Sequence, residues 1–150
     1  MTTPLPRSDK LAQRLALAIP ALLLAGAYVS EYGFGLFPCE MCWWQRYPHF
    51  AAIGLALIST FAAQKRMWIG LAALAIAISG AIGAFHAGVE YGWWPSPLGC
   101  TGSNPFSLEF VRCDEAAWSL FGISLAGWNA LLSIGSAVAI WVLLLAKERA

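Results

Sequence analysis

Four long stretches of the chain are mostly apolar and contain no Asp, Glu, Lys or Arg, and the segments between them carry the charge. These stretches cover residues 15–30, 47–64, 67–89 and 116–146. A helix that crosses a bilayer needs about 20 mostly apolar residues, because the hydrocarbon core is roughly 30 Å thick. We therefore predict an all-α fold, a polytopic bundle of four transmembrane helices. The predicted spans are approximately residues 12–32, 45–64, 67–89 and 122–146, with loops on one side at approximately 33–44 and 90–121.

The composition indicates that lipid replaces water as the solvent. The chain has 150 residues, of which 59% are hydrophobic and 11% charged, and its mean hydropathy is +0.65. A soluble domain averages about 45–50% apolar and about 25% charged residues. The few charged residues are not enough to cover the core of a soluble domain, and the high apolar content excludes a disordered chain. The net charge of +1 provides no basic surface for nucleic acid. We predict one integral membrane domain over residues 1–150.

The charges are distributed unevenly between the flanking segments. Seven of the nine basic residues lie in the N-terminal segment, in the connection after the second stretch and at the C-terminus. Six of the eight acidic residues lie in the other two loops. Because cytoplasmic segments collect Lys and Arg, we place both termini and the tight turn from Gln64 to Arg66 in the cytoplasm. The loops at 33–44 and 90–121 are then outside.

The first stretch has a second interpretation. Arg7, Lys10 and Arg14 precede an apolar run rich in Ala and Leu, as in a cleaved signal peptide. We favour a membrane span because the run is longer than the roughly 7–15 apolar residues of such a peptide. Cleavage would leave three spans, with Cys39 on the same side.

The third stretch is dense in small residues. Small side chains that recur three or four apart let helix backbones approach closely in lipid. They predict a tight bundle. The stripe comprises Ala73, Ala77, Ala81, Ala84 and Gly88, and Gly80 and Gly83 lie nearby.

The first two cysteines form a C-x-x-C motif, Cys39 and Cys42, directly before the second span. If a helix begins near Cys39, its free backbone N–H groups and its dipole stabilise a thiolate, and Arg46, one turn after Cys42, adds a cation. We therefore favour a redox-active dithiol with a low-pKa thiolate. A structural disulfide and a metal site built from all four cysteines are the alternatives, but the first closes almost no loop and the second lacks a second close pair.

The other two cysteines, Cys100 and Cys113, lie in a segment rich in Pro and Gly that we predict to be a mobile loop. Cys100 has glycines close on both sides and should be accessible. The stretch from Phe106 to Trp118 has apolar residues that fit one side of a short interfacial helix. A disulfide here serves either a redox role or merely the closure of the loop.

Three segments resemble the disulfide bond formation protein B (DsbB) family of bacterial inner-membrane oxidoreductases. They are CEMCWWQRYP at residues 39–48, FHAGVEYGWW at residues 85–94 before Cys100, and WxxFGxSxxxWN at residues 118–129 after Cys113. The resemblance implies a protein-disulfide oxidoreductase that reoxidises a periplasmic DsbA-like thiol oxidase and passes two electrons to membrane quinone, either ubiquinone or menaquinone. The loop between Cys100 and Cys113 is short for the family, so the resemblance leaves open whether the partner is general or dedicated.

The resemblance also implies a role for each cysteine. The partner's thiolate would attack Cys100, and Cys113 would be released to exchange with Cys39. Cys42 would face the quinone, with Arg46 and His86 beside it as further quinone-binding residues. Exchange needs an accessible target and a good leaving thiolate, and a lipid-soluble quinone reaches only a sulfur at the membrane boundary, as Cys42 is. We expect no metal at these residues, and we expect His49 to be structural.

Two other functional classes share some of these features. A reductase of the vitamin K epoxide reductase type also sets a C-x-x-C motif against a four-helix bundle, but the Trp-Trp-Gln-Arg context after Cys42 fits it less well. A non-catalytic membrane subunit with two structural disulfides would need no quinone at all.

Overall fold

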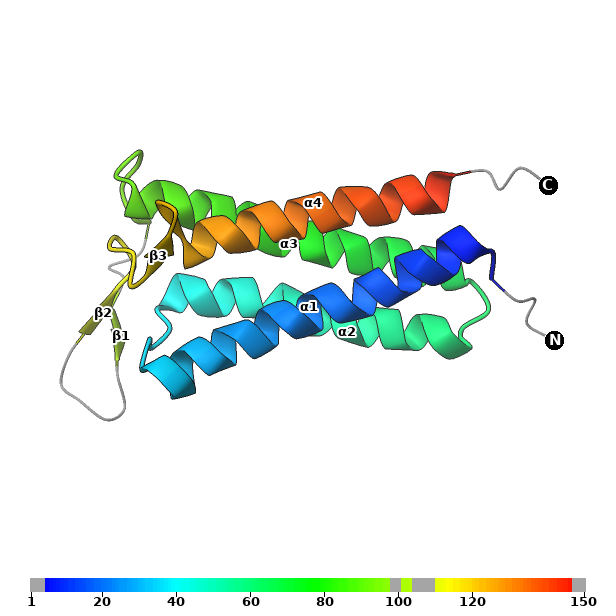
Figure 1. The fold of residues 1–150 in the computed structure, drawn as a ribbon, viewed down its shortest axis with the longest axis horizontal. Helices are drawn as coiled ribbons and strands as arrows, with labels where there is room; N and C mark the ends of the chain where they lie inside the picture. The colour runs from blue at the N-terminus through cyan, green and yellow to red at the C-terminus, as the bar shows by residue number, and fades with distance from the viewer. Residues whose placement is uncertain (1–4, 98–100, 104–109, 147–150) are drawn as a thin grey trace.

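Four helices run lengthwise through the computed structural model, which describes residues 5–97, 101–103 and 110–146 (Figure 1). The start of α1 and the end of α4 lie at one end of the bundle, and the short strands lie at the other (Figure 1). The helices are α1 Arg7–Phe34, α2 Glu40–Phe61, α3 Lys65–Glu90 and α4 Leu125–Leu145.

Each predicted span coincides with one helix to within a few residues. Three of the helices, α1, α3 and α4, are long and apolar enough to cross a membrane. The described part of the chain is therefore mostly helical, with three candidate membrane spans. The connection between α2 and α3 covers residues 62–64, slightly earlier than the turn predicted from Gln64 to Arg66, because α3 already begins at Lys65.

The segment between α3 and α4 forms two small antiparallel hairpins in its described residues. Strand β1 (Thr101–Ser103) pairs with β2 (Phe110–Arg112), and β3 (Ser119–Leu120) pairs with β4 (Ile123–Ser124). Two residues with positive φ, Phe121 at 52° and Gly122 at 77°, connect β3 to β4, which is the backbone of the tight turn that suits the twist of a two-residue hairpin.

The interfacial helix predicted over Phe106 to Trp118 is not present in the described part of that stretch. Residues 110–112 are strand, and the next helix begins only at Leu125. Residues 106–109 lie outside the described residues. The apolar pair Phe110 and Val111 is too short a pattern to distinguish the helical period from the strand period, and the pairing with β1 selects the strand.

The end of α1 and the start of α2 are fixed by local signals. Gly35 adopts a left-handed φ of 69° and its N–H bonds back to Ser30, which ends α1. Cys39 is the N-cap of α2, and its sulfur accepts a hydrogen bond from the backbone N–H of Cys42 at 3.4 Å. The C-x-x-C motif therefore occupies the first turn of α2, as the sequence predicts.

Helix α3 packs against both α2 and α4 along a face of small residues. Its buried positions include Ala72, Ala73, Ser79, Gly80 and Gly83. The predicted stripe is wrong in part, because Ala81 and Ala84 are exposed. The buried face is rotated relative to that stripe.

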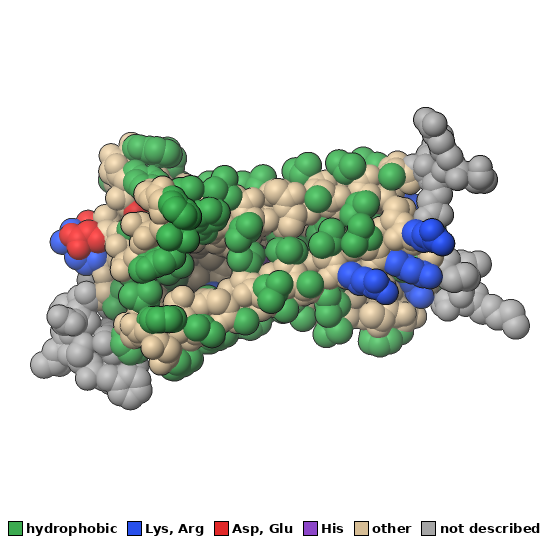
Figure 2. Space-filling view, in the orientation of Figure 1, with side chains coloured by type: hydrophobic (Ala, Val, Ile, Leu, Met, Phe, Trp, Pro, Cys, Tyr) green, Lys and Arg blue, Asp and Glu red, His purple; other side chains and the backbone are tan. Residues whose placement is uncertain are grey.

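A polar contact ties three helices together at the end opposite the strands. Arg66 of α3 donates to the Asp9 carboxylate at 3.2 Å and to the backbone carbonyl of Leu144 at the end of α4. Asp9 is fully buried although it lies in the first turns of α1. Figure 2 shows other basic side chains gathered at this end, whereas the acidic side chains visible on the same face lie at the hairpin end.

The packing at Gly80 yields a first prediction. A Cβ atom there would lie 2.7 Å from Cγ1 of Ile134 and 3.1 Å from that residue's backbone nitrogen, so α3 and α4 must move apart. We expect Gly80→Ala to destabilise the bundle by about 1–3 kcal/mol, measured as a lower thermal unfolding midpoint in detergent. Gly135→Ala is the matched control, because nothing lies within 4 Å of its Cβ position. Equal midpoints for the two variants would contradict the close approach.

Candidate functional site

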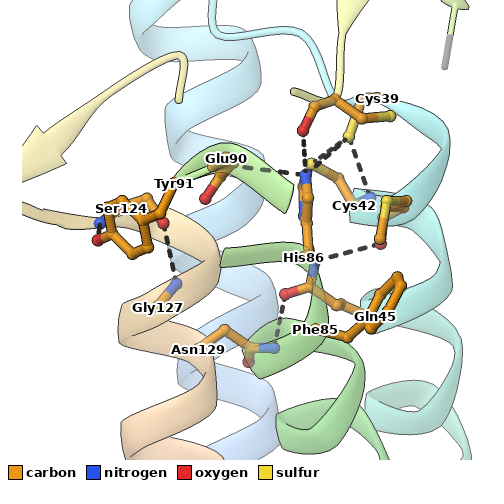
Figure 3. A network of polar contacts seen from close by, with 12 residues as sticks. Cys39, Cys42, Gln45, Phe85, His86, Glu90, Tyr91, Ser124, Gly127 and Asn129 are labelled. Carbon is orange, nitrogen blue, oxygen red and sulfur yellow. Dashed lines mark hydrogen bonds and ion pairs between the residues drawn. The ribbon is translucent and has the colours of Figure 1, made fainter. Parts of the chain in front are cut away.

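The two thiols of the C-x-x-C motif lie together at the hairpin end of the bundle (Figure 3). Cys39 and Cys42 are both free thiols, with their sulfur atoms 3.0 Å apart. Cys39 is 2% exposed, while Cys42 is partly exposed. One thiol therefore donates a hydrogen bond to the other, and the pair is close enough to form a disulfide with little movement.

The two thiols differ in acidity. The hydrogen bond to Cys42, together with burial, raises the pKa of Cys39 far above the ordinary value of a thiol. The same hydrogen bond lowers the pKa of Cys42, whereas burial raises it. A contact between the Cys42 thiol and the backbone of Cys39 adds to the lowering. Cys42, which precedes the predicted span at 45–64, therefore ionises first, and the Cys39 thiol stabilises its thiolate by donating to it.

Arg46 does not supply the cation that the sequence suggested for Cys42. Its guanidinium donates to the Glu31 carboxylate at 2.6 Å and to the carbonyl oxygen of Ala27 at 3.4 Å. Its charge centre lies 4.8 Å from the ring centroids of Tyr28 and Trp43. Arg46 and Glu31 are both buried, so the charge of Arg46 is neutralised by α1, and the Cys39 thiol takes its place in stabilising the thiolate.

His86 of α3 lies between the dithiol and the interior of the bundle (Figure 3). Its Nε2 atom is 3.7 Å from the sulfur of Cys39 and 3.2 Å from the carbonyl oxygen of Cys113. Its Nδ1 atom is 2.9 Å from the side-chain nitrogen of Gln45. His86 is 2% exposed. The structure therefore brings His86 to the dithiol, as expected for a site residue.

Cys113 follows strand β2 and packs into the same place. It is fully buried, and its sulfur lies within 4.8 Å of both the Cys39 sulfur and a ring nitrogen of His86. Two sulfurs and an imidazole are ligands that zinc prefers. A zinc-bound imidazole, however, almost always donates its other N–H to an acceptor, and here that nitrogen faces the amide nitrogen of Gln45. The hydrogen bonds therefore favour a thiol site over a metal site.

A pocket of about 270 Å³ adjoins the thiols. Its walls come from all four helices and from the segment around Val111, and its apolar part includes α1 leucines and Leu125 and Trp128 of α4. Its polar part includes Cys39, Cys42, Arg46, His86 and Glu90. Figure 2 shows a recess on this face between α1 and α4, close to the hairpin end.

His49, which we expect to be structural, contacts other polar groups than His86 does. His49 is 3% exposed, and its Nε2 atom lies 2.9 Å from the side-chain oxygens of both Asn129 and Ser79. It joins α2, α3 and α4 inside the bundle, although it also lines the deep end of the pocket. Cys100 lies outside the described residues.

Sequence reasoning missed four polar residues at the site. From the sequence, we counted Glu31 and Glu90 only as charges of the outer loops. In the structure Glu31 neutralises Arg46, and the carboxylate of Glu90 lies 3.7 Å from Nε2 of His86. Gln45 and Asn129 lie in the segments that resemble the DsbB family but had no predicted role, and they bond to each other at 2.9 Å. The sequence signal for them was their polarity within apolar spans, since such groups need partners in a membrane.

The fold and the site together define a helical membrane protein with a closely spaced dithiol at one end. The chain matches the family of Disulfide bond formation protein DsbB over residues 9–143, and it belongs to that family. It is therefore a disulfide-bond-forming membrane protein.

Several curated relatives carry the name Disulfide bond formation protein B. That of Verminephrobacter eiseniae is 35% identical over 78% of this chain and 75% of its own length. That of an Azoarcus strain is 32% identical over 93% of this chain and 95% of its own length, and that of an Acidovorax strain is 30% identical over 90% and 86%. No solved structure gives a significant match.

The contact between the two thiols yields a second prediction. The test uses a protein carrying Cys100→Ser and Cys113→Ser, in which the rate of Cys42 alkylation by iodoacetamide is measured against pH. Because this rate follows the thiolate fraction, we expect its pH midpoint to lie below the value of about 8.5 for an ordinary thiol. Adding Cys39→Ala removes the donor and should move the midpoint to higher pH. Cys39→Ser keeps a hydroxyl donor and should move it less. A midpoint indifferent to both substitutions would show that Cys39 does not stabilise the thiolate.

Proposed function

We propose that the protein is a quinone-dependent thiol oxidase that reoxidises a periplasmic DsbA-like partner. The observation that carries the proposal is the placement of three sulfurs. The Cys39 sulfur lies 3.0 Å from that of Cys42 and within 4.8 Å of that of Cys113, beside a largely apolar pocket. A disulfide can therefore pass from one loop to the other through Cys39.

The exchange is balanced at each step. The thiolate of the reduced partner attacks Cys100 of a Cys100–Cys113 disulfide, and Cys113 leaves as a thiolate. Cys113 then attacks the Cys39 sulfur of a Cys39–Cys42 disulfide, and Cys42 leaves as a thiolate. The partner's second thiolate then attacks the mixed disulfide, so the partner leaves as a disulfide and Cys100 leaves as a thiolate. Cys100 attacks Cys113 of the Cys113–Cys39 disulfide, which re-forms Cys100–Cys113 and leaves Cys39 and Cys42 reduced. Low pKa favours departure of a leaving thiolate, and the lowered pKa of Cys42 supports its part in this order.

The acceptor that we propose is a membrane quinone, ubiquinone or menaquinone, which supplies the capacity to take up two electrons and two protons. The pocket fits a small ring, since about 270 Å³ approaches the lower limit of roughly 300 Å³ for small-molecule sites. Arg46 and His86 both line it. Arg46 has guanidinium N–H groups beyond the two that Glu31 and Ala27 accept, and these can donate to a ring oxygen. Leucines of α1 supply apolar contact for the ring, and Cys42 lies at the pocket wall.

We further propose that α2 is a fourth span and that the chain lies in the bacterial inner membrane with both termini in the cytoplasm. Helix α2 runs alongside α3 and is as long as α4, although Glu40 and Arg46 reduce its mean hydropathy (Figure 1). Glu31 neutralises Arg46 within the bundle, so this charge does not oppose insertion. Four spans place all the cysteines on the periplasmic side.

The proposed reaction yields a third prediction. Purified protein with added ubiquinone or menaquinone and a reduced DsbA-like partner should consume quinone, followed by its ultraviolet absorbance, in step with partner oxidation. Cys42→Ser should abolish quinone loss. Thr60→Ala is the matched control, because its exposed hydroxyl bonds only to its own helix far from the site. Unchanged quinone loss in Cys42→Ser, or none with the unmodified protein, would refute the function.

The proposed orientation yields a fourth prediction. A reporter that is active only in the cytoplasm should be active when fused after Ala150, and a reporter that is active only in the periplasm should be active when inserted after Gly35. Gly35 lies between α1 and α2, where a Cβ meets nothing within 4 Å. The opposite pair of activities would overturn the charge count.

A further inference from the structure

Two side-chain amides in the bundle each contact a backbone carbonyl that fixes their orientation. The nitrogen of Gln45 donates to the carbonyl oxygen of Met41 at 3.1 Å, and the nitrogen of Asn129 donates to that of Ser79 at 3.3 Å. A carbonyl only accepts hydrogen bonds. Rotating either amide would bring two oxygen atoms together, so both nitrogens point as they do here.

These orientations determine the proton on His86. The amide oxygen of Gln45 accepts from Asn129 at 2.9 Å, so the amide nitrogen of Gln45 is the atom that faces Nδ1 of His86, also at 2.9 Å. An amide nitrogen is a donor and not an acceptor. Nδ1 must then carry the lone pair, and the ring proton of neutral His86 must lie on Nε2.

The other side of the ring leads independently to the same answer. Nε2 of His86 lies 3.2 Å from the carbonyl oxygen of Cys113, which again only accepts. The remaining groups facing Nε2 are the Cys39 sulfur and the Glu90 carboxylate, each at 3.7 Å, and both are also acceptors. Within the described part of the chain, each group that contacts Nε2 is therefore an acceptor that favours a proton on Nε2, and the amide nitrogen that contacts Nδ1 excludes a proton there (Figure 3).

We propose that Gln45, itself oriented by Asn129, holds His86 as the neutral tautomer protonated at Nε2, and that this N–H docks the backbone of Cys113 beside Cys39. With the proton on Nδ1 instead, two lone pairs would face each other between His86 and Cys113. Gln45 is thus a positioning residue that acts through His86. The functional meaning rests on the proposed exchange between Cys113 and Cys39, in which the sulfur of Cys113 must stay close to that of Cys39.

The tautomer itself is measured by nitrogen NMR and needs neither quinone nor partner. The chain has only two histidines, so protein labelled with ¹⁵N-histidine gives two ring patterns, and the one lost in His86→Phe belongs to His86. In reduced protein in detergent, we expect Nε2 of His86 to be the protonated nitrogen and Nδ1 to be unprotonated. A proton on Nδ1 of His86 would overturn the proposal.

Gln45→Glu tests the source of the preference. A carboxylate in place of the amide accepts instead of donating, so Nδ1 of His86 should become protonated in this variant. Gln13→Glu is the matched control, because Gln13 also bonds between helices, to Ser59 at 2.8 Å, but lies on α1 toward the opposite end. The control should leave the His86 pattern unchanged. An unprotonated Nδ1 in Gln45→Glu would show that Gln45 does not set the tautomer.

The docking of Cys113 is tested by the ease with which it forms a disulfide with Cys39. In a protein carrying Cys42→Ser and Cys100→Ser, the effective concentration of the two remaining thiols is read from a glutathione redox buffer, in which glutathione disulfide is the oxidant. His86→Gln keeps a donor near the position of Nε2 and should retain most of this value. His86→Asn places its nitrogen near Nδ1 and should lower the value about threefold to tenfold, as expected for one lost hydrogen bond.

Equal effective concentrations in His86→Gln and His86→Asn would overturn the docking role, even if quinone reduction by the native protein were intact. Conversely, absence of quinone reduction with the Nε2 tautomer and the docking both observed would refute the proposed function alone. The two proposals therefore fail separately.

Discussion

The site depends on the absence of a side chain at Gly83. A Cβ atom there would lie 2.9 Å from the carbonyl oxygen of Ala126 and 3.0 Å from the amide groups of Asn129 and Gln45. The hydrogen bond between those two amides, one from α2 and one from α4, therefore passes directly over α3 at this point. In an apolar bundle each of these polar groups must find a partner in the protein. Close approach at Gly83 is what lets them find one another and, through Gln45, orient His86.

The positions of the helices could be predicted from the sequence because they follow from the distribution of charged residues along the chain. Charge-free runs correspond to α1 through α4, since charged groups are excluded from hydrocarbon whatever the details of packing. The C-x-x-C motif was likewise readable as a helix start, because Cys39 caps α2 through its own side chain. These features depend on a few neighbouring residues or on the membrane, and not on tertiary contacts.

The features that the sequence did not reveal all depend on a partner distant in the chain. Arg46 lies one turn from Cys42, as its spacing requires, but an ion pair with Glu31 of another helix neutralises its charge. The stretch after residue 110 becomes a strand because residues 101–103 pair with it. The buried face of α3 is set by where α2 and α4 lie, so small residues alone did not locate it. The roles of the four cysteines, the quinone and the orientation in the membrane stay predictions, and Cys100 lies outside the described residues.

The N-cap of α2 has a consequence for the backbone. The sulfur that accepts the N–H of Cys42 is the Cys39 sulfur, which would change its bonding in each turnover. The two sulfurs are 3.0 Å apart as thiols, whereas a disulfide holds them about 2.05 Å apart, so oxidation changes the geometry of the turn that the Cys39 sulfur caps. The capping hydrogen bond of α2 should therefore differ between the oxidised and the reduced protein. The rate of amide hydrogen exchange at Cys42 would then report whether the Cys39–Cys42 pair is oxidised or reduced.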